Sequence, residues 1–402
     1  MDNSSFNNYR QGDYQRTNFD AFLKHINFNY IVPSIHITGT NGKGSTAEYI
    51  YASYMENGYK VGIFSSPSLS DVNQMIRINH QAISDEEING IINRYQKEIK
   101  KFDLSAFEVQ AFIAFTYFME SHCDIAVIEC GMGGLMDATN VFTPILSIIT
   151  TISIEHTDYL GYSLSEVAEH KAGIIKENVP VLIQEFDEDA LNVVLKTVKE
   201  DKAQVYYINR FVEQTLTDQG YSFIYTLFGE VKLDSIASYS VTDACFALEA
   251  IKILQNQFPF DIAKVKEGIS KVHMPGRMER ITDNIVLDGG HNPEAISRLT
   301  KDIVRYSKGK TIHIVFACFR DKNLIGMLSS LGAISNDITL TTFNHPRARK
   351  EEEYFLFLDD YHYQDDAYQL IKDKANEYPN DIILVTGSLA FVGYIRKCFQ
   401  IK

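Results

Sequence analysis

The chain has 402 residues, of which 45% are hydrophobic and 22% charged, and its formal net charge at pH 7 is -14. This length suffices for two or three domains, and the acidic balance excludes a general binder of nucleic acid or anionic membranes, because such surfaces need a basic stripe. A polar N-terminus without a signal-peptide core, no apolar run of membrane-spanning length and no Cys-x-x-Cys pair favour a cytoplasmic enzyme.

Short β-rich apolar runs alternate with helical patterns along most of the chain. Two of these runs, residues 124–130 and 144–151, are apolar almost throughout, as central parallel strands are when helices cover both faces of the sheet. The alternation predicts βαβ units and doubly wound sheets, and hence an α/β fold. The expected strands are Ile35–Thr38, Val61–Ser65, Asp124–Glu129, Ile145–Ile152, Pro180–Gln184, Ile285–Asp288, Thr311–Ala317, Asp337–Thr342 and Ile382–Thr386.

The stretch from about residue 201 to residue 240 has another pattern, in which apolar and polar residues alternate as in antiparallel hairpins. A helix is expected next, over residues 241–254, and residues 271–281 have the composition of a linker into a second α/β unit. We therefore expect two domains, residues 1–273 and residues 274–402, with a small antiparallel β subregion in the first.

A glycine-rich turn, Gly39–Gly44, comes after the first expected strand. It is shorter than the usual phosphate loop, and the hydroxyls of Ser45 and Thr46 come one place late. The helical run after it would place free amides and Lys43 around one spot, which is the arrangement that binds phosphate. The alternative is a tight strand-to-helix turn whose glycines supply unusual backbone angles. The strand–turn–helix context favours the phosphate loop.

Three polar residues, Ser66, Glu129 and His156, lie at or just after the ends of other expected strands. Ligands of open α/β sheets bind beyond the carboxyl ends of the strands, so these side chains would converge if their strands are neighbours. Hydroxyl and carboxylate oxygens suit Mg²⁺, whereas imidazole is a less usual ligand for it. The alternatives are a capping role for Ser66 and an ordinary loop histidine at position 156.

Lys171 lies on the apolar stripe of a predicted helix that runs from Leu164 to Ile175. Lysine is rarely buried without a partner. Its side chain would therefore either extend to the edge of the apolar surface or point into an active site.

Taken in order, the motifs of the chain resemble those of the folylpolyglutamate synthase/dihydrofolate synthase family of the Mur-ligase superfamily. The resemblance runs through nearly the whole chain. Its segments are HITGTNGKGS from His36, SSP from Ser65, FE from Phe107, IECGMGGLMDATN from Ile128, EHT from Glu155, HKAGIIK from His170, PGRMER from Pro275, LDGGHNP from Leu287, RDKN from Arg320, PRA from Pro346 and TGSL from Thr386.

This resemblance implies an ATP-dependent amide ligase with a P-loop ATPase-like (Mur-ligase central-type) N-terminal domain and a Rossmann-like C-terminal glutamate-ligase domain. A carboxylate of folate or dihydropteroate would attack the γ-phosphate of MgATP, and the amine of L-glutamate would displace phosphate from the acyl phosphate. The resemblance also implies two Mg²⁺ ions and a monovalent cation. The expected partners are these small molecules, without nucleic acid or membrane, and we expect a monomer.

The resemblance also assigns roles by position. The nucleotide-binding residues would be Asn41, Gly42, Lys43, Gly44, Ser45, Arg277 and Asp288, and the metal ligands Ser66, Glu129, His156 and Lys171, the last as a carbamate. Phe107, Glu108, His291 and Ser388 would bind the acceptor and the incoming glutamate. The catalytic residues would be Lys43, Lys171, His156 and His291.

The chain departs from the family pattern at several positions, among them a segment that in the family helps to hold the nucleotide. The departures are Gln74 and Met75, Ala111, Glu155, and, in that segment, Ala237, Ser240 and Asp243. They leave open a non-catalytic or altered-specificity nucleotide- or folate-binding relative.

Two other classes fit the sequence less well. A peptidoglycan-precursor ligase is expected to need a whole domain before its phosphate loop, whereas 38 residues precede Gly39. A generic P-loop kinase or switch GTPase fits the loop but leaves LDGGHNP in the second domain unexplained.

Overall fold

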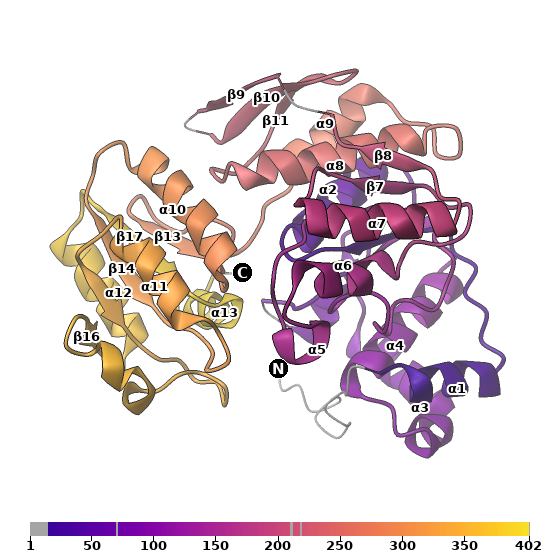
Figure 1. Cartoon of the computed structure of the whole chain (residues 1–402), viewed down its shortest axis with the longest axis horizontal. Coiled ribbons are helices and arrows are strands. Elements are labelled where there is room, and N and C mark those ends of the chain that lie inside the picture. The colour runs from indigo at the N-terminus through magenta and orange to yellow at the C-terminus, as the bar shows by residue number, and fades with distance from the viewer. Residues whose placement is uncertain (1–14, 70, 210–211, 218, 402) are drawn as a thin grey trace. The chain divides into compact units, whose positions relative to one another are not determined.

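The computed structural model describes residues 15–69, 71–209, 212–217 and 219–401 (Figure 1). It divides into two compact units. The first extends to Thr215 and includes Ser222–Leu233 and Ser240–Val272, and the second consists of Leu216–Tyr221, Asp234–Tyr239 and the chain from His273 onward. The polar N-terminal stretch noted in the sequence, residues 1–14, lies outside the described residues.

An eight-stranded sheet forms the centre of the first unit, in the order β4-β3-β2-β5-β1-β6-β7-β8. The six strands from β2 to β8 in this order are parallel, and β3 and β4 add an antiparallel edge. Every residue of the four central strands is buried. The strands are β1 Ser34–Thr38, β2 Val61–Phe64, β3 Ile76–Ile78, β4 Gln81–Ala82, β5 Ile125–Glu129, β6 Leu146–Ile149, β7 Val181–Ile183 and β8 Val205–Tyr207.

Helices cover this sheet and pack into separate hydrophobic clusters. α3 and α4 form one cluster with β2, β3 and β5, and α6 and α7 form another with β6 and β7. The helices of the unit are α1 Thr17–His25, α2 Lys43–Glu56, α3 Asp85–Lys101, α4 Ala106–Glu120, α5 Thr157–Leu160, α6 Leu164–Ala172, α7 Glu188–Glu200, α8 Tyr239–Ile253 and α9 Ile262–Ser270, with a 3-10 turn at Val72–Met75.

The region expected to form antiparallel hairpins does so only in part. β9 Val212–Leu216, β10 Tyr221–Tyr225 and β11 Gly229–Lys232 form a separate three-stranded sheet, in which β10 and β11 are antiparallel. The hairpin interpretation was wrong for β8, which pairs in parallel with β7. β8 is an edge strand with partly exposed residues, so its sequence lacks the continuous apolar run that marks a central parallel strand.

The second unit has a six-stranded sheet in the order β12-β13-β17-β14-β15-β16, in which only β12 is antiparallel to its neighbour. Alternate residues of β13 enter different clusters: Val286 packs with α10 and α11, whereas Ile285 and Leu287 pack with α12 and α13. Helices therefore cover both faces, and the predicted α/β fold with two doubly wound domains is confirmed.

The elements of the second unit include all four strands predicted there. The strands are β12 Glu279–Arg280, β13 Ile285–Asp288, β14 Ile312–Phe316, β15 Ile338–Leu340, β16 His362–Tyr363 and β17 Ile382–Thr386. The helices are α10 Pro293–Ser307, α11 Leu324–Gly332, α12 Ala367–Glu377 and α13 Leu389–Cys398, with a 3-10 segment at Glu351–Phe357.

α2, the helix that begins at the glycine-rich turn, is held from one side by α9. Gly268 of α9 lies against the backbone of α2, because a Cβ at this glycine would come 2.6 Å from the carbonyl oxygen of Ala52. The close contact between the two helices therefore requires glycine at position 268.

We predict that Gly268→Ala destabilises the protein by about 1–3 kcal/mol, since the added methyl group must push α9 away from α2. The matched control is Gly90→Ala in the middle of α3, where a Cβ meets nothing within 4 Å. Alanine there should raise the free energy of unfolding by about 0.5–1 kcal/mol through helix propensity. Denaturant unfolding measures both, and equal effects of the two changes would contradict the close-contact interpretation.

Candidate active site

The glycine-rich turn between β1 and α2 has the backbone of an anion-binding loop. Gly42 is the N-cap of α2 and is left-handed, with φ 86°, and as a glycine it has no side chain to cap the helix. The first amides of a 14-residue helix are thus available to a ligand, as in phosphate-binding loops. The helix begins at Lys43, inside the glycine-rich turn rather than after it.

Residues that come after β6 support this loop from behind. The Asn41 amide donates to the Thr151 hydroxyl at 2.8 Å, and the Thr150 hydroxyl donates to the Asn41 carbonyl at 2.7 Å. Gly39 packs so closely that a Cβ there would come 1.9 Å from Oγ1 of Thr150. These threonines were expected to belong to a strand, whereas β6 ends at Ile149 and frees them to bind the loop.

Lys43 lies at the N-terminal end of α2 with its ammonium group over the loop. Its Nζ donates to the carbonyl oxygens of Gly39 at 2.7 Å and of Thr40 at 3.2 Å. Two carbonyls do not neutralise an ammonium charge, so this group is suited to exchange them for phosphate oxygens.

Ser66 and Glu129 meet beside the loop. They lie at or just after the ends of the adjacent parallel strands β2 and β5, and the Ser66 amide donates to Oε2 of Glu129 at 3.1 Å. The same oxygen lies 3.3 Å from the position of a Cβ at Gly44, and the Glu129 side chain is buried. A hydroxyl and a carboxylate next to a phosphate loop fit Mg²⁺, which is bound through one or two carboxylates plus substrate phosphates.

His156 is placed differently from these two residues. It is the left-handed N-cap of α5, with φ 48°, and its Nε2 lies 4.0 Å from a carboxylate oxygen of Glu155. The described part of the chain holds no group of three or more His, Cys, Asp and Glu side chains that could bind a metal ion. The geometry therefore supports Ser66 and Glu129 as ligands more directly than His156.

Lys171 is fully buried in α6, and its Nζ lies 2.9 Å from Oε1 of Glu155. Its side chain therefore does not extend to the protein surface. Burial lowers the pKa of Lys171, with a further contribution from the charge of Lys43, while Glu155 opposes the shift. Burial also opposes the ionisation of Glu155, but the charges of Lys171, Lys43 and His156 prevail and lower its pKa to about 2. These four charged or titratable side chains thus form one electrostatic cluster.

Asp243 is a site residue whose position was not foreseen, although the sequence marked it as a departure. It lies on α8 with only 6% of its surface exposed. Its Oδ1 comes 2.4 Å from the position of a Cβ at Gly42, so its carboxyl group touches the loop backbone directly. No spacing in the sequence signals this contact, because it depends on how α8 packs.

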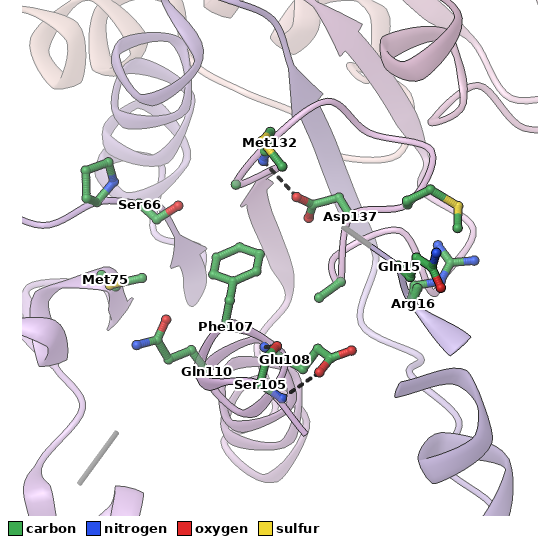
Figure 2. A pocket seen from close by; sticks show the side chains of 14 residues that line it. Gln15, Arg16, Ser66, Met75, Ser105, Phe107, Glu108, Gln110, Met132 and Asp137 are labelled. Atoms are coloured by element: carbon green, nitrogen blue, oxygen red, sulfur yellow. Dashed lines mark hydrogen bonds between the residues drawn. The ribbon is translucent and has the colours of Figure 1, made fainter. Parts of the chain in front are cut away.

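A pocket of about 440 Å³ opens beside Ser66. Figure 2 shows the ring of Phe107 projecting into it from α4, with Gln110 on the same helix and Met75 nearby. The Phe107 ring lies so close to Gly131 that a Cβ there would come 2.5 Å from it. The pocket combines an aromatic face with methionines, a lining suited to a flat heterocycle.

Two acidic residues of the pocket have well-defined partners (Figure 2). Asp137 accepts hydrogen bonds from the Met132 amide at 2.8 Å and from the Thr139 hydroxyl at 2.6 Å, and burial raises its pKa. Glu108 forms a capping box with Ser105 at the start of α4, accepting from the Ser105 amide at 2.6 Å. Part of the Glu108 carboxylate therefore serves the helix as well as the pocket. The sequence analysis assigned no role to Asp137, although it lies within the segment that begins at Ile128, nor to Ser105 and Gln110.

The expected site residues of the second unit gather at the end of β13. The Asp288 carboxylate accepts from Tyr239 Oη at 2.8 Å, from the Met278 amide at 2.9 Å and from the Gly290 amide at 2.8 Å. Burial raises the pKa of Asp288, and the charge of Arg277 opposes that shift. The charge of Arg277 thus acts on the Asp288 carboxylate, and this carboxylate holds the backbone at Met278 and Gly290.

His291 and Ser388 lie near the ends of neighbouring strands of that sheet. The imidazole Nδ1 of His291 donates to the Gly289 carbonyl at 3.1 Å. Ser388 is the N-cap of α13 and comes after β17, the strand paired with β13. Its hydroxyl makes no cap hydrogen bond with the helix.

Two models of known protein families match this chain, one in each of its two parts. Residues 37–248 match the Mur ligase middle domain, and residues 276–389 match the glutamate ligase domain of Mur ligases. The dihydrofolate synthase/folylpolyglutamate synthase of Bacillus subtilis is 30% identical over 91% of this chain and 90% of its own length, and the folylpolyglutamate synthase of Lacticaseibacillus casei is 30% identical over 90% and 89%.

Among solved structures, the Mycobacterium tuberculosis folylpolyglutamate synthase complexed with ADP and AMPPCP superposes with a TM-score of 0.89 and 26% identity, covering 96% of each chain. The match to the Mur ligase middle domain alone spans more than half of the chain. Together with relatives that match along nine-tenths of the chain, it shows that the chain belongs to the folylpolyglutamate synthase/dihydrofolate synthase family of Mur ligases.

Proposed function

We propose that this protein is an ATP-dependent ligase that joins L-glutamate to the carboxylate of a folate or of dihydropteroate. The observation that carries the proposal is that Ser66 belongs both to the pocket and to the surroundings of the phosphate loop. It lines the apolar pocket, and its amide donates to Glu129 beside the phosphate loop. A flat heterocycle in that pocket would thus be held next to the residues that receive ATP phosphates. The names of the relatives and the matching glutamate ligase domain support the same reaction.

The chain's own residues would act mainly by positioning and by charge. The amides at the start of α2 and the ammonium of Lys43 bind the phosphates of ATP, and Ser66 and Glu129 hold Mg²⁺. When bound, Mg²⁺ neutralises charge on the transferring phosphoryl group. The acceptor carboxylate attacks the γ-phosphorus, ADP leaves, and an acyl phosphate forms.

Glutamate ligation completes the reaction. The amine of L-glutamate attacks the acyl carbon, the C–O bond to phosphate breaks, and inorganic phosphate leaves as the amide forms and the amine loses a proton. In the second unit, the imidazole of His291 and the hydroxyl of Ser388, which lie near the ends of neighbouring strands, would orient glutamate. Arg277, next to Asp288, is the nucleotide-binding candidate there.

Lys171 is the proposed site of a carbamate. Burial favours its neutral amine, the form that reacts with CO₂, and the resulting carboxylate-like group would present oxygens to a second Mg²⁺. Glu155 favours the ammonium form instead, since it pairs with Nζ at 2.9 Å. Carbamate formation, in which the amine nitrogen bonds to the carbon of CO₂ and releases a proton, therefore breaks this ion pair, and the Glu155 carboxylate would need another partner.

None of the described helices is both long and apolar enough to cross a membrane. The cytoplasmic location, the monomeric state and the monovalent cation remain predictions from the sequence.

The experiment that tests the function measures phosphate release with MgATP and L-glutamate, with either dihydropteroate or tetrahydrofolate as acceptor. We expect glutamate-dependent release with at least one acceptor. The control omits glutamate, which should reduce sustained turnover. Release with neither acceptor, from folded protein, would instead support the non-catalytic relative.

Lys43→Ala should slow ATP turnover by about 100-fold or more, since the loop loses its ammonium group while the core is untouched. Lys199→Ala on α7, an exposed position, is the matched control and should retain turnover. Thermal unfolding should give similar midpoints for the two variants. Near-normal turnover of Lys43→Ala would remove the phosphate-loop assignment.

Lys171→Ala should bind ATP yet turn over slowly, and small carboxylic acids should partly restore the rate by replacing the carbamate oxygens. Removal of the ammonium leaves the buried Glu155 unpaired, so stability must be measured alongside activity. Lys176→Ala, which removes a nearby lysine bonded to the Gly173 carbonyl, is the control. In ¹³C-bicarbonate, the native protein should show a carbamate carbon signal that Lys171→Ala lacks. Full activity in both Lys171→Ala and bicarbonate-depleted native protein would refute the carbamate.

A further inference from the structure

Two buried carboxylates approach the start of α2 from different elements. Glu129, at the end of β5, lies beside Gly44, and Asp243, on α8, lies beside Gly42. Asp243 is the closer of the two, at 2.4 Å from the Cβ position of its glycine against 3.3 Å for Glu129. Since Gly42 has no side chain, nothing separates the Asp243 carboxyl group from the loop backbone.

Charges of both signs lie around the start of α2. Lys43 is the cation whose ammonium group lies on the loop carbonyls. Lys171 is paired with Glu155 and therefore adds little net positive charge. The N-terminus of α2 contributes the equivalent of roughly half a positive charge. The buried carboxylates of Asp243 and Glu129 thus lie at the same end of α2 as the ammonium of Lys43 and the helix dipole, and buried charges are weakly screened.

Asp243 does not extend the metal site described above. Glu129 has Ser66 beside it, on the adjacent strand, whereas Asp243 reaches the loop from α8. Its carboxylate touches the backbone of the loop that would hold the phosphates, so its charge repels a bound phosphate.

We propose that Asp243 makes nucleotide binding at this loop conditional on Mg²⁺. Its carboxylate repels the phosphates of metal-free ATP, which carry about four negative charges, and tolerates MgATP, whose charge the cation halves. Asp243 is thus a specificity-determining residue that selects the metal-bound form of the substrate. This inference rests on the proposed nucleotide site, because it assumes that the phosphates occupy the start of α2.

The test is equilibrium binding of ATP, with Mg²⁺ and with EDTA, to the full-length protein and to Asp243→Asn. Asparagine keeps the shape and removes the charge. We expect the variant to bind metal-free ATP about tenfold more tightly and MgATP less than about threefold more tightly. The ratio of the two affinities, which measures the dependence on Mg²⁺, should therefore fall. Asp243→Ala should change the ratio in the same direction, and it replaces the first variant if asparagine impairs folding.

Two further variants serve as controls for this experiment. Glu249→Gln removes another buried carboxylate from the same helix, one that bonds with Tyr225 and Asn209, and should leave the ratio unchanged. Glu129→Gln should also lower the ratio, but by weakening the binding of MgATP, because it removes a proposed metal ligand, whereas Asp243→Asn lowers it by strengthening the binding of metal-free ATP.

The possible failures can be told apart. If native protein binds MgATP but Asp243→Asn leaves the ratio at its native value, the role of Asp243 is refuted and the proposed function stands. Weaker MgATP binding by Asp243→Asn would also refute it, since the carboxylate would then be a ligand. If native protein binds no nucleotide with or without Mg²⁺, the proposed function itself fails.

Discussion

The close contact between the β1–α2 loop and the residues after β6 is the constraint on which the site depends. β1 lies between β5 and β6, so the segments that leave these two strands enclose its loop. Gly39 has no room for a side chain against Thr150, and the two threonines hold Asn41 by three hydrogen bonds. Because the loop is already fixed, it can direct the first amides of α2 at a ligand without losing conformational freedom when the ligand binds.

The charge arrangement is a consequence of that enclosure. A half-buried loop among strand ends brings Lys43, Glu155, Lys171 and His156 within range of one another, in surroundings that screen charges poorly. Lys171 and Glu155 illustrate the result, since each shifts the pKa of the other. Such a pair is costly to bury and contributes less to stability than apolar packing would, so its presence suggests a role in the reaction.

Much of the fold was predictable because its signals are local. Central strands such as β5 and β13 read as apolar runs, and the burial of Lys171 agrees with its place on the stripe of one helix. The phosphate loop was likewise visible in one continuous segment. The parallel pairing of β8 was not, because an edge strand alternates like a hairpin strand and pairing is a property of two segments.

The candidate site likewise contains some residues that could be proposed from short segments of sequence and others whose role depends on contacts with distant parts of the chain. Ser66 and Glu129 could be proposed because the carboxyl ends of parallel strands share one edge of a sheet. Asp137 and Asp243 could not, because one lies in a long loop and the other in the first turns of a helix. For Asp243 the sequence showed only an unusual residue type, and its contact with Gly42 gave that type a physical meaning.

The position of the pocket explains why binding and phosphoryl transfer can be coupled within the first unit. Ser66 and Met132 stand at the pocket wall, and the strands that precede them, β2 and β5, also carry the residues beside the phosphate loop. An acceptor stacked on Phe107 would thus be positioned by the same strand ends that position ATP. Because strand ends in a buried sheet move little, the two substrates would be oriented by one rigid frame, which is the main contribution a protein makes to a transfer of this kind.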